Sequence, residues 1–115
     1  MAANTVLERK FFPAGETIFR EGDTGSVAYI VQSGLVELWC GRQCIAELEQ
    51  NAIFGEMALI DGAPRMATAK AQSDVTAIVL PRALFESKLE GVDPFVIKLI
   101  GILIGNVRNL ARIVG

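Results

Sequence analysis

Short apolar runs alternate with turn-forming residues along the first two thirds of the chain. The run 35–40, for example, places Val36, Leu38 and Cys40 on one face, the period expected of a half-buried strand. Glycine, proline and aspartate punctuate these runs. The pattern predicts strands at residues 10–12, 17–19, 27–32, 35–40, 45–48, 66–71 and 75–80.

The pattern becomes helical after Pro81. A first helix is predicted at 82–89 and ends before Gly91. Asp93 is a suitable N-cap for a second helix at 94–114. We therefore expect one mainly β domain over residues 1–115. Its antiparallel, jelly-roll-like β-roll covers residues 8–81, and the two α-helices follow it.

The second predicted helix is apolar on more than one face. Gly101 and Gly105 are four residues apart, a spacing that lets another helix approach closely. Such a helix either packs on its own roll or pairs with another chain. We predict a homodimer through this helix, and packing of both faces on the roll is the alternative. The apolar stripe consists of Val96, Leu99, Leu103, Val107 and Leu110, with Phe95, Ile102 and Ile113 beside it.

Composition and charge exclude several classes of function. The formal net charge is −2 and no run of Lys or Arg is present, so no nucleic-acid partner is expected. The apolar run 99–107 would rise only about 13 Å as a helix, too little to span a bilayer. The chain has no histidine, which removes the commonest metal ligand and general base. Neither a metal site nor a catalytic site is therefore expected.

Two cysteines, Cys40 and Cys44, flank a tight turn. We expect two reduced strand residues, and a redox pair across the hairpin is the alternative. So few cysteines are typical of a protein of the reducing cytoplasm.

One stretch carries candidate binding chemistry. Gly55 allows close backbone approach to a ligand, and a short helix predicted at 57–60 offers unpaired N–H groups to an anion. Arg65 follows the stiff Pro64 turn and can bind two phosphate oxygens with its planar fork. Glu56 carries only acceptors, which suit sugar hydroxyls. This arrangement predicts a sugar-phosphate clamp.

The stretch 54–68, Phe-Gly-Glu-Met-Ala-Leu-Ile-Asp-Gly-Ala-Pro-Arg-Met-Ala-Thr, resembles the phosphate-binding cassette of the cyclic-nucleotide-binding domain family. This family includes kinase regulatory subunits, nucleotide-gated channels and the bacterial catabolite activator protein. The likeness extends to residues 12–16, 18–23 and 29–34, and covers about 10–107. Asn51 departs from the family's frequent glycine, but asparagine tolerates the left-handed conformation that the turn requires.

The resemblance implies a role for each cassette residue. Arg65 would pair with the equatorial phosphate oxygen, and Glu56 would accept from the ribose 2′-hydroxyl. The alternative is that these two side chains only pair with each other. The ligand-binding residues implied are Gly55, Glu56, Met57, Ala58, Arg65, Met66 and Ala67.

The ligand is expected to be cyclic AMP, because Met66 lacks the hydroxyl that often binds guanine in cyclic GMP receptors of the family. The function expected is a receptor whose helices move on binding to regulate a partner that the sequence does not identify. Alternatives are a degenerate cassette serving dimerisation or protein interaction, or the sensor fragment of a larger regulator.

Overall fold

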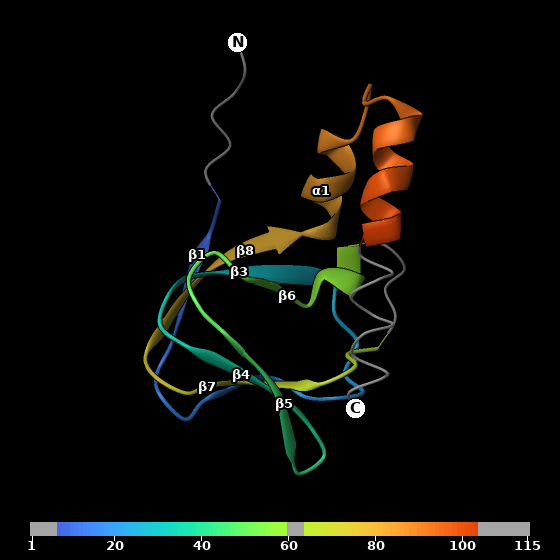
Figure 1. The fold of residues 1–115 in the computed structure, drawn as a ribbon. Helices are drawn as coiled ribbons and strands as arrows, with labels where there is room; N and C mark the ends of the chain where they lie inside the picture. Colours follow the sequence, from blue (N-terminus) through green and yellow to red (C-terminus); the bar gives the residue numbers. More distant parts are fainter. Residues whose placement is uncertain (1–6, 60–63, 104–115) are drawn as a thin grey trace.

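The computed structural model describes residues 7–59 and 64–103, apart from the side chain of Met57. The described part is a roll of β-strands followed by two helices, which confirms the predicted fold class (Figure 1). A single 3-10 turn, η1 (Glu56–Leu59), lies within the roll. The helices are α1 (Arg82–Lys88) and a second one at 94–103. The strands are β1 (Arg9–Phe12), β2 (Thr17–Phe19), β3 (Val27–Ser33), β4 (Val36–Cys40), β5 (Gln43–Leu48), β6 (Ile53–Phe54), β7 (Thr68–Ala71) and β8 (Val75–Pro81).

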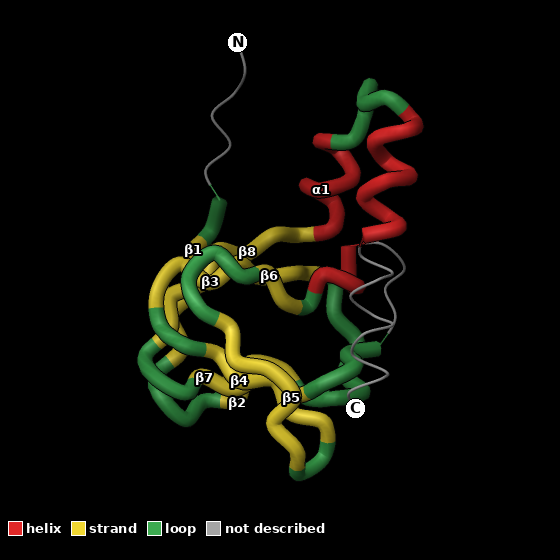
Figure 2. Tube along the Cα trace, in the orientation of Figure 1, coloured by secondary structure: helices red, strands yellow, loops and turns green. Residues whose placement is uncertain are grey.

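The strands form two antiparallel sheets that face each other. One sheet has the order β1-β8-β3-β6, and the other has the order β2-β7-β4-β5. Figure 2 shows them as two layers, with the helices at the end of the roll where β8 finishes. The chain crosses between the sheets repeatedly, so segments distant in sequence meet at this end.

The core lies between the two sheets and follows the strand period. In β8, Val75, Ala77 and Val79 are buried and the residues between them are partly exposed. Aromatic rings fill the end of the core near η1. Their centroids are 5.2 Å apart for Tyr29 and Phe54 and 5.9 Å apart for Phe19 and Phe54.

Some predicted strand boundaries were wrong. The strand predicted at 66–71 begins at Thr68, because the backbone of Arg65 bonds to a loop instead of to a sheet neighbour. The last strand includes Pro81, which sits at its end opposite Val27. The two-residue strand β6 was not predicted, because so short a segment shows no periodicity.

Two local predictions are confirmed. Asn51 adopts the left-handed conformation, with φ 75°. The carboxylate of Asp93 accepts a hydrogen bond of 2.8 Å from the backbone N–H of Phe95, as an N-cap does. The rest of the predicted second helix, with Gly105, lies outside the described residues. So do Val107, Leu110 and Ile113.

The hairpin places the two cysteines apart. Cys40 pairs with Gln43 and Cys44 pairs with Trp39, so the two side chains point to opposite faces of the hairpin. Both thiols are free. The alternative of a redox pair across the hairpin is therefore wrong. Within the described residues, no helix is long and apolar enough to cross a membrane.

Candidate functional site

The backbone of Arg65 is anchored to the loop that follows β2. Its N–H donates to the carbonyl of Asp23 at 2.8 Å, and its own carbonyl accepts from the N–H of Gly22 at 2.8 Å. These two bonds place Arg65 before β7 and point its side chain inward, although the residue is charged. Only 8% of Arg65 is exposed.

Three groups hold the guanidinium of Arg65. Nη2 donates to the carbonyl of Val27 at 2.8 Å, and Nη1 donates to the carbonyl of Gly55 at 3.2 Å. Cζ lies over the ring of Phe19, 4.1 Å from its centroid, which is a cation–π contact. The arginine is therefore held by groups from β2, β3 and the residue that precedes η1.

Two glycines make room for this side chain. A Cβ on Gly25 would lie 2.8 Å from Cζ and 2.9 Å from Nε of Arg65, and it would also meet Nη2. A Cβ on Gly55 would lie 2.6 Å from Nη1. Gly55 also has φ 72°, a conformation that other residues rarely adopt. Any side chain at either glycine would displace the guanidinium.

The buried guanidinium has no carboxylate partner among the described residues. No ion pair of Arg65 within 4.0 Å occurs there, and Nε is buried without a hydrogen-bond partner. Burial lowers the pKa of Arg65, while Tyr29, Asp23 and Glu56 act electrostatically in the opposite direction. A buried cation is costly unless it is paired. The arrangement is suited to an anionic ligand.

Glu56 begins η1 and is partly buried. Burial raises the pKa of its carboxyl, and its own backbone N–H and the charge of Arg65 act to lower it. The alternative, a direct pair with Arg65, does not form in the described structure, where no ion pair within 4.0 Å joins the two residues. The predicted helix at 57–60 is a 3-10 turn that begins one residue earlier, and one such turn has little dipole to offer an anion.

The other residues predicted to bind the ligand lie in different surroundings. Ala58 is buried, and its N–H donates to the carbonyl of Gly55 at 3.1 Å. The carbonyl of Met66 accepts from Sγ of Cys40 at 3.5 Å. Ala67 is buried. Met57 lies in η1, with its side chain outside the described structure.

Sequence reasoning missed three contributors to this site. Phe19 was assigned to a strand and to the family likeness at 18–23 but not to the binding site, and Gly25 was not singled out from the turn residues near it. Val27 contributes a backbone carbonyl, which no side-chain pattern reveals. A second glycine three residues after Gly22 was the available signal.

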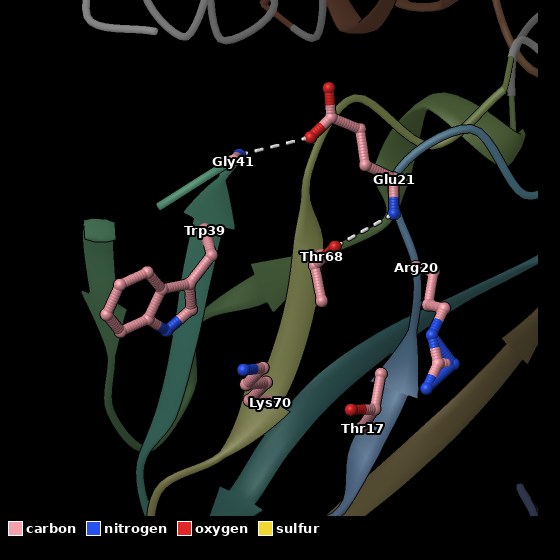
Figure 3. A pocket seen from close by; sticks show the side chains of 7 residues that line it. All are labelled: Thr17, Arg20, Glu21, Trp39, Gly41, Thr68 and Lys70. Atoms are coloured by element: carbon pink, nitrogen blue, oxygen red, sulfur yellow. Dashed lines mark hydrogen bonds between the residues drawn. The ribbon is translucent and has the colours of Figure 1, made fainter. Parts of the chain in front are cut away.

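A separate polar concavity of about 370 Å³ lies on the sheet β2-β7-β4-β5 (Figure 3). Lys70 extends toward the indole of Trp39, with Nζ 5.6 Å from the ring centroid. Glu21 closes one end, where its backbone N–H donates to Oγ1 of Thr68 at 3.0 Å. None of the predicted ligand-binding residues lines this concavity, although Thr68, the last residue of the stretch 54–68, does. Its lining residues are Thr17, Arg20, Glu21, Trp39, Gly41, Thr68 and Lys70.

Comparison with known proteins gives a family match over the part of the chain that contains Arg65. The model of the cyclic nucleotide-binding domain matches residues 9–91. The chain is also 34% identical over 87 residues to a cAMP-dependent protein kinase regulatory subunit of Hypocrea atroviridis. That match covers 76% of this chain and 19% of the relative, so the chain spans about a fifth of the relative's length.

Solved structures are similar over most of the chain. The catabolite activator protein of Thermus thermophilus has a TM-score of 0.75 and 29% identity, covering 90% of this chain and 51% of that protein. The EAL enzyme Bd1971 in its cAMP-bound form has a TM-score of 0.76 and 29% identity, covering 90% of this chain and 29% of the enzyme. Its cGMP-bound form has a TM-score of 0.79 and 28% identity, covering 91% and 29%.

Proposed function

Since the chain belongs to the cyclic nucleotide-binding domain family, we propose that it is a receptor that prefers cyclic AMP and transmits binding through its helices. The observation that carries this proposal is the buried guanidinium of Arg65. It has an unpaired Nε and no carboxylate within 4.0 Å among the described residues. The cyclic phosphate supplies the missing negative charge, and the fork of Arg65 binds its oxygens.

Glu56 is proposed to accept a hydrogen bond from the ribose 2′-hydroxyl. Its position nine residues before Arg65 brings an acceptor into the electrostatic range of the cation without neutralising it. The preference for cyclic AMP is supported by the apolar side chain of Met66 beside Arg65. The names of similar proteins include both cAMP-bound and cGMP-bound forms, so both nucleotides belong in the test.

The contacts of Arg65 support a route from the phosphate to the helices. Nη2 of Arg65 bonds to the carbonyl of Val27. The carbonyl of the preceding residue, Ser26, accepts a 2.8 Å bond from the N–H of Arg82, the first residue of α1. The turn η1 also packs against α1. A phosphate bound to Arg65 is therefore connected through Val27 and Ser26 to the segment where α1 begins.

Calorimetric titration of the nucleotide-stripped protein tests the ligand. Cyclic AMP should bind more tightly than cyclic GMP, and 5′-AMP should bind poorly because its phosphate is not cyclic. A folded protein that gives no heat and no thermal shift with any of them would support the degenerate-cassette alternative instead.

Variants test the residue assignments. Arg65→Ala should weaken cyclic AMP binding by about 2–5 kcal/mol, the range for removing one side of a buried charge pair. Arg42→Ala, which removes an exposed arginine at the β4–β5 turn, is the matched control and should bind normally. Glu56→Gln should weaken cyclic AMP but barely affect its 2′-deoxy analogue. Equal losses with both ligands would contradict the ribose assignment.

The proposal also includes a homodimer, a lack of catalytic activity and a cytoplasmic location. The second helix exposes Phe95 by 70% and Ile102 by 51%, which supports a homodimer through this helix. Sedimentation should show a dimer that Ile102→Glu dissociates, and a wild-type monomer at all concentrations would refute it. We expect a binding module without catalytic activity that acts in the cytoplasm.

A further inference from the structure

The ring of Phe19 is the one side chain among the described residues that lies in cation–π contact with Arg65, with Cζ 4.1 Å from its centroid. We propose that Phe19 is a positioning residue that holds Arg65 ready for an anion before any ligand arrives. This inference rests on the proposed function, because it assigns a role in nucleotide binding to a residue outside the cassette.

Neighbouring rings fix the orientation of Phe19. Its centroid lies 6.3 Å from that of Tyr29, with an interplanar angle of 26°, and 5.9 Å from that of Phe54, with an angle of 37°. The ring cannot turn away from Arg65 without disturbing this cluster, so it is a rigid support.

The contact through the ring face leaves the polar edge of the arginine available. A guanidinium carries five N–H donors in its plane, and a π contact uses none of them. Two of these donors bond to the carbonyls of Val27 and Gly55, and Nε has no partner. Phe19 therefore stabilises the position of the charge while the donors remain for phosphate oxygens.

Holding the side chain in advance lowers the cost of binding. Ordering a long, rotamer-rich side chain at a binding site costs about 0.5–1.5 kcal/mol, which corresponds to about 2- to 12-fold in affinity. Without the ring, only the carbonyls of Val27 and Gly55 would hold the guanidinium, and part of this ordering would have to occur when the nucleotide binds. Phe19→Leu should therefore weaken cyclic AMP about 2- to 12-fold, and Phe19→Tyr should restore binding because it keeps the ring.

The test measures the ligand-free arginine as well as affinity. Side-chain protons of Arg65 should show an upfield ring-current shift by NMR in the wild type and in Phe19→Tyr, and lose it in Phe19→Leu. Phe12→Leu is the control, since Phe12 belongs to the same cluster but packs edge-on against Tyr29, 5.9 Å between centroids. It should retain both the shift and the affinity. Phe19→Met replaces the leucine variant if that one does not fold.

The outcomes separate this inference from the proposed function. Unchanged or tighter cyclic AMP binding in a folded Phe19→Leu protein would overturn the positioning role alone, because the ring would then be neutral or would compete with the phosphate. An absent ring-current shift in the wild type would also overturn it. A wild type that keeps the shift but binds no cyclic nucleotide would overturn the proposed function, and the positioning role with it.

Discussion

Replacing Gly25 by alanine tests whether that glycine is required by Arg65 and by nothing else. Its φ is not in the left-handed region, so alanine fits the backbone. The new Cβ would lie 2.8 Å from Cζ of Arg65, whereas ordinary contacts are about 3.5–4.0 Å. The guanidinium must therefore retreat by about 1 Å.

The retreat would break the 2.8 Å bond from Nη2 to the carbonyl of Val27. A hydrogen bond of a charged group contributes about 1.5–3 kcal/mol. Alanine also restricts the unfolded chain, which adds about 0.4–1 kcal/mol of stability. Gly25→Ala should therefore lower the free energy of unfolding by about 1–2 kcal/mol.

The same substitution in an Arg65→Ala background should have a different sign. There the new methyl group meets no guanidinium, and only the stabilisation of about 0.4–1 kcal/mol remains. Urea denaturation of the four proteins measures the coupling energy, expected at about 1.5–3 kcal/mol. Gly101→Ala, at a helical position with nothing within 4 Å, is the control and should show no coupling to Arg65. An equal cost of Gly25→Ala in both backgrounds would refute the reasoning.

Other predictions concern Glu56 and the scaffold. Because burial raises the pKa of Glu56, cyclic AMP affinity should fall as the pH decreases through that raised value, and calorimetry should find this dependence absent in Glu56→Gln. Without ligand, protonated Glu56 contributes to the free energy of unfolding because its pKa is higher in the folded protein. This contribution is complete below the ordinary glutamate pKa and is lost as the pH rises through the raised pKa. Phe54→Ala, at a residue 1% exposed, should destabilise the protein by about 3–5 kcal/mol in urea. Asp93→Ala removes the 2.8 Å cap and should lower helix content and cost about 0.5–2 kcal/mol.

The alternation of residues was sufficient to predict most of the roll. Val75, Ala77 and Val79 are buried, as their period of two requires, and glycine-containing turns separate most strands. The alternation did not predict strand boundaries correctly where strands are very short or where the chain leaves the sheet. Ile53–Phe54 is too short to show a period. Met66 precedes β7, where the chain is still bonded to the loop of Asp23, a contact between distant segments.

The candidate cassette could be proposed from the sequence because its polar residues lie within one continuous stretch. The supports of Arg65 could not, since Phe19, Gly25 and Val27 come from other segments and meet it only in the folded roll. None of them carries a charge that would mark it as part of an anion site. Phe19 has the same apolar character as the core residues around it.

The cassette residues can be found in the sequence and the supports of Arg65 cannot. This difference follows from the energetics of a buried charge. Moving Arg65 out of water is unfavourable, and the fold compensates with two carbonyls and a ring. These groups are neutral, so they hold the guanidinium without cancelling its charge, whereas a carboxylate at the same distance would compete with a phosphate. A receptor arginine is best supported by neutral partners, which leave little trace in a sequence pattern. The contacts that we propose to prepare Arg65 for an anion are therefore those that the sequence reveals least.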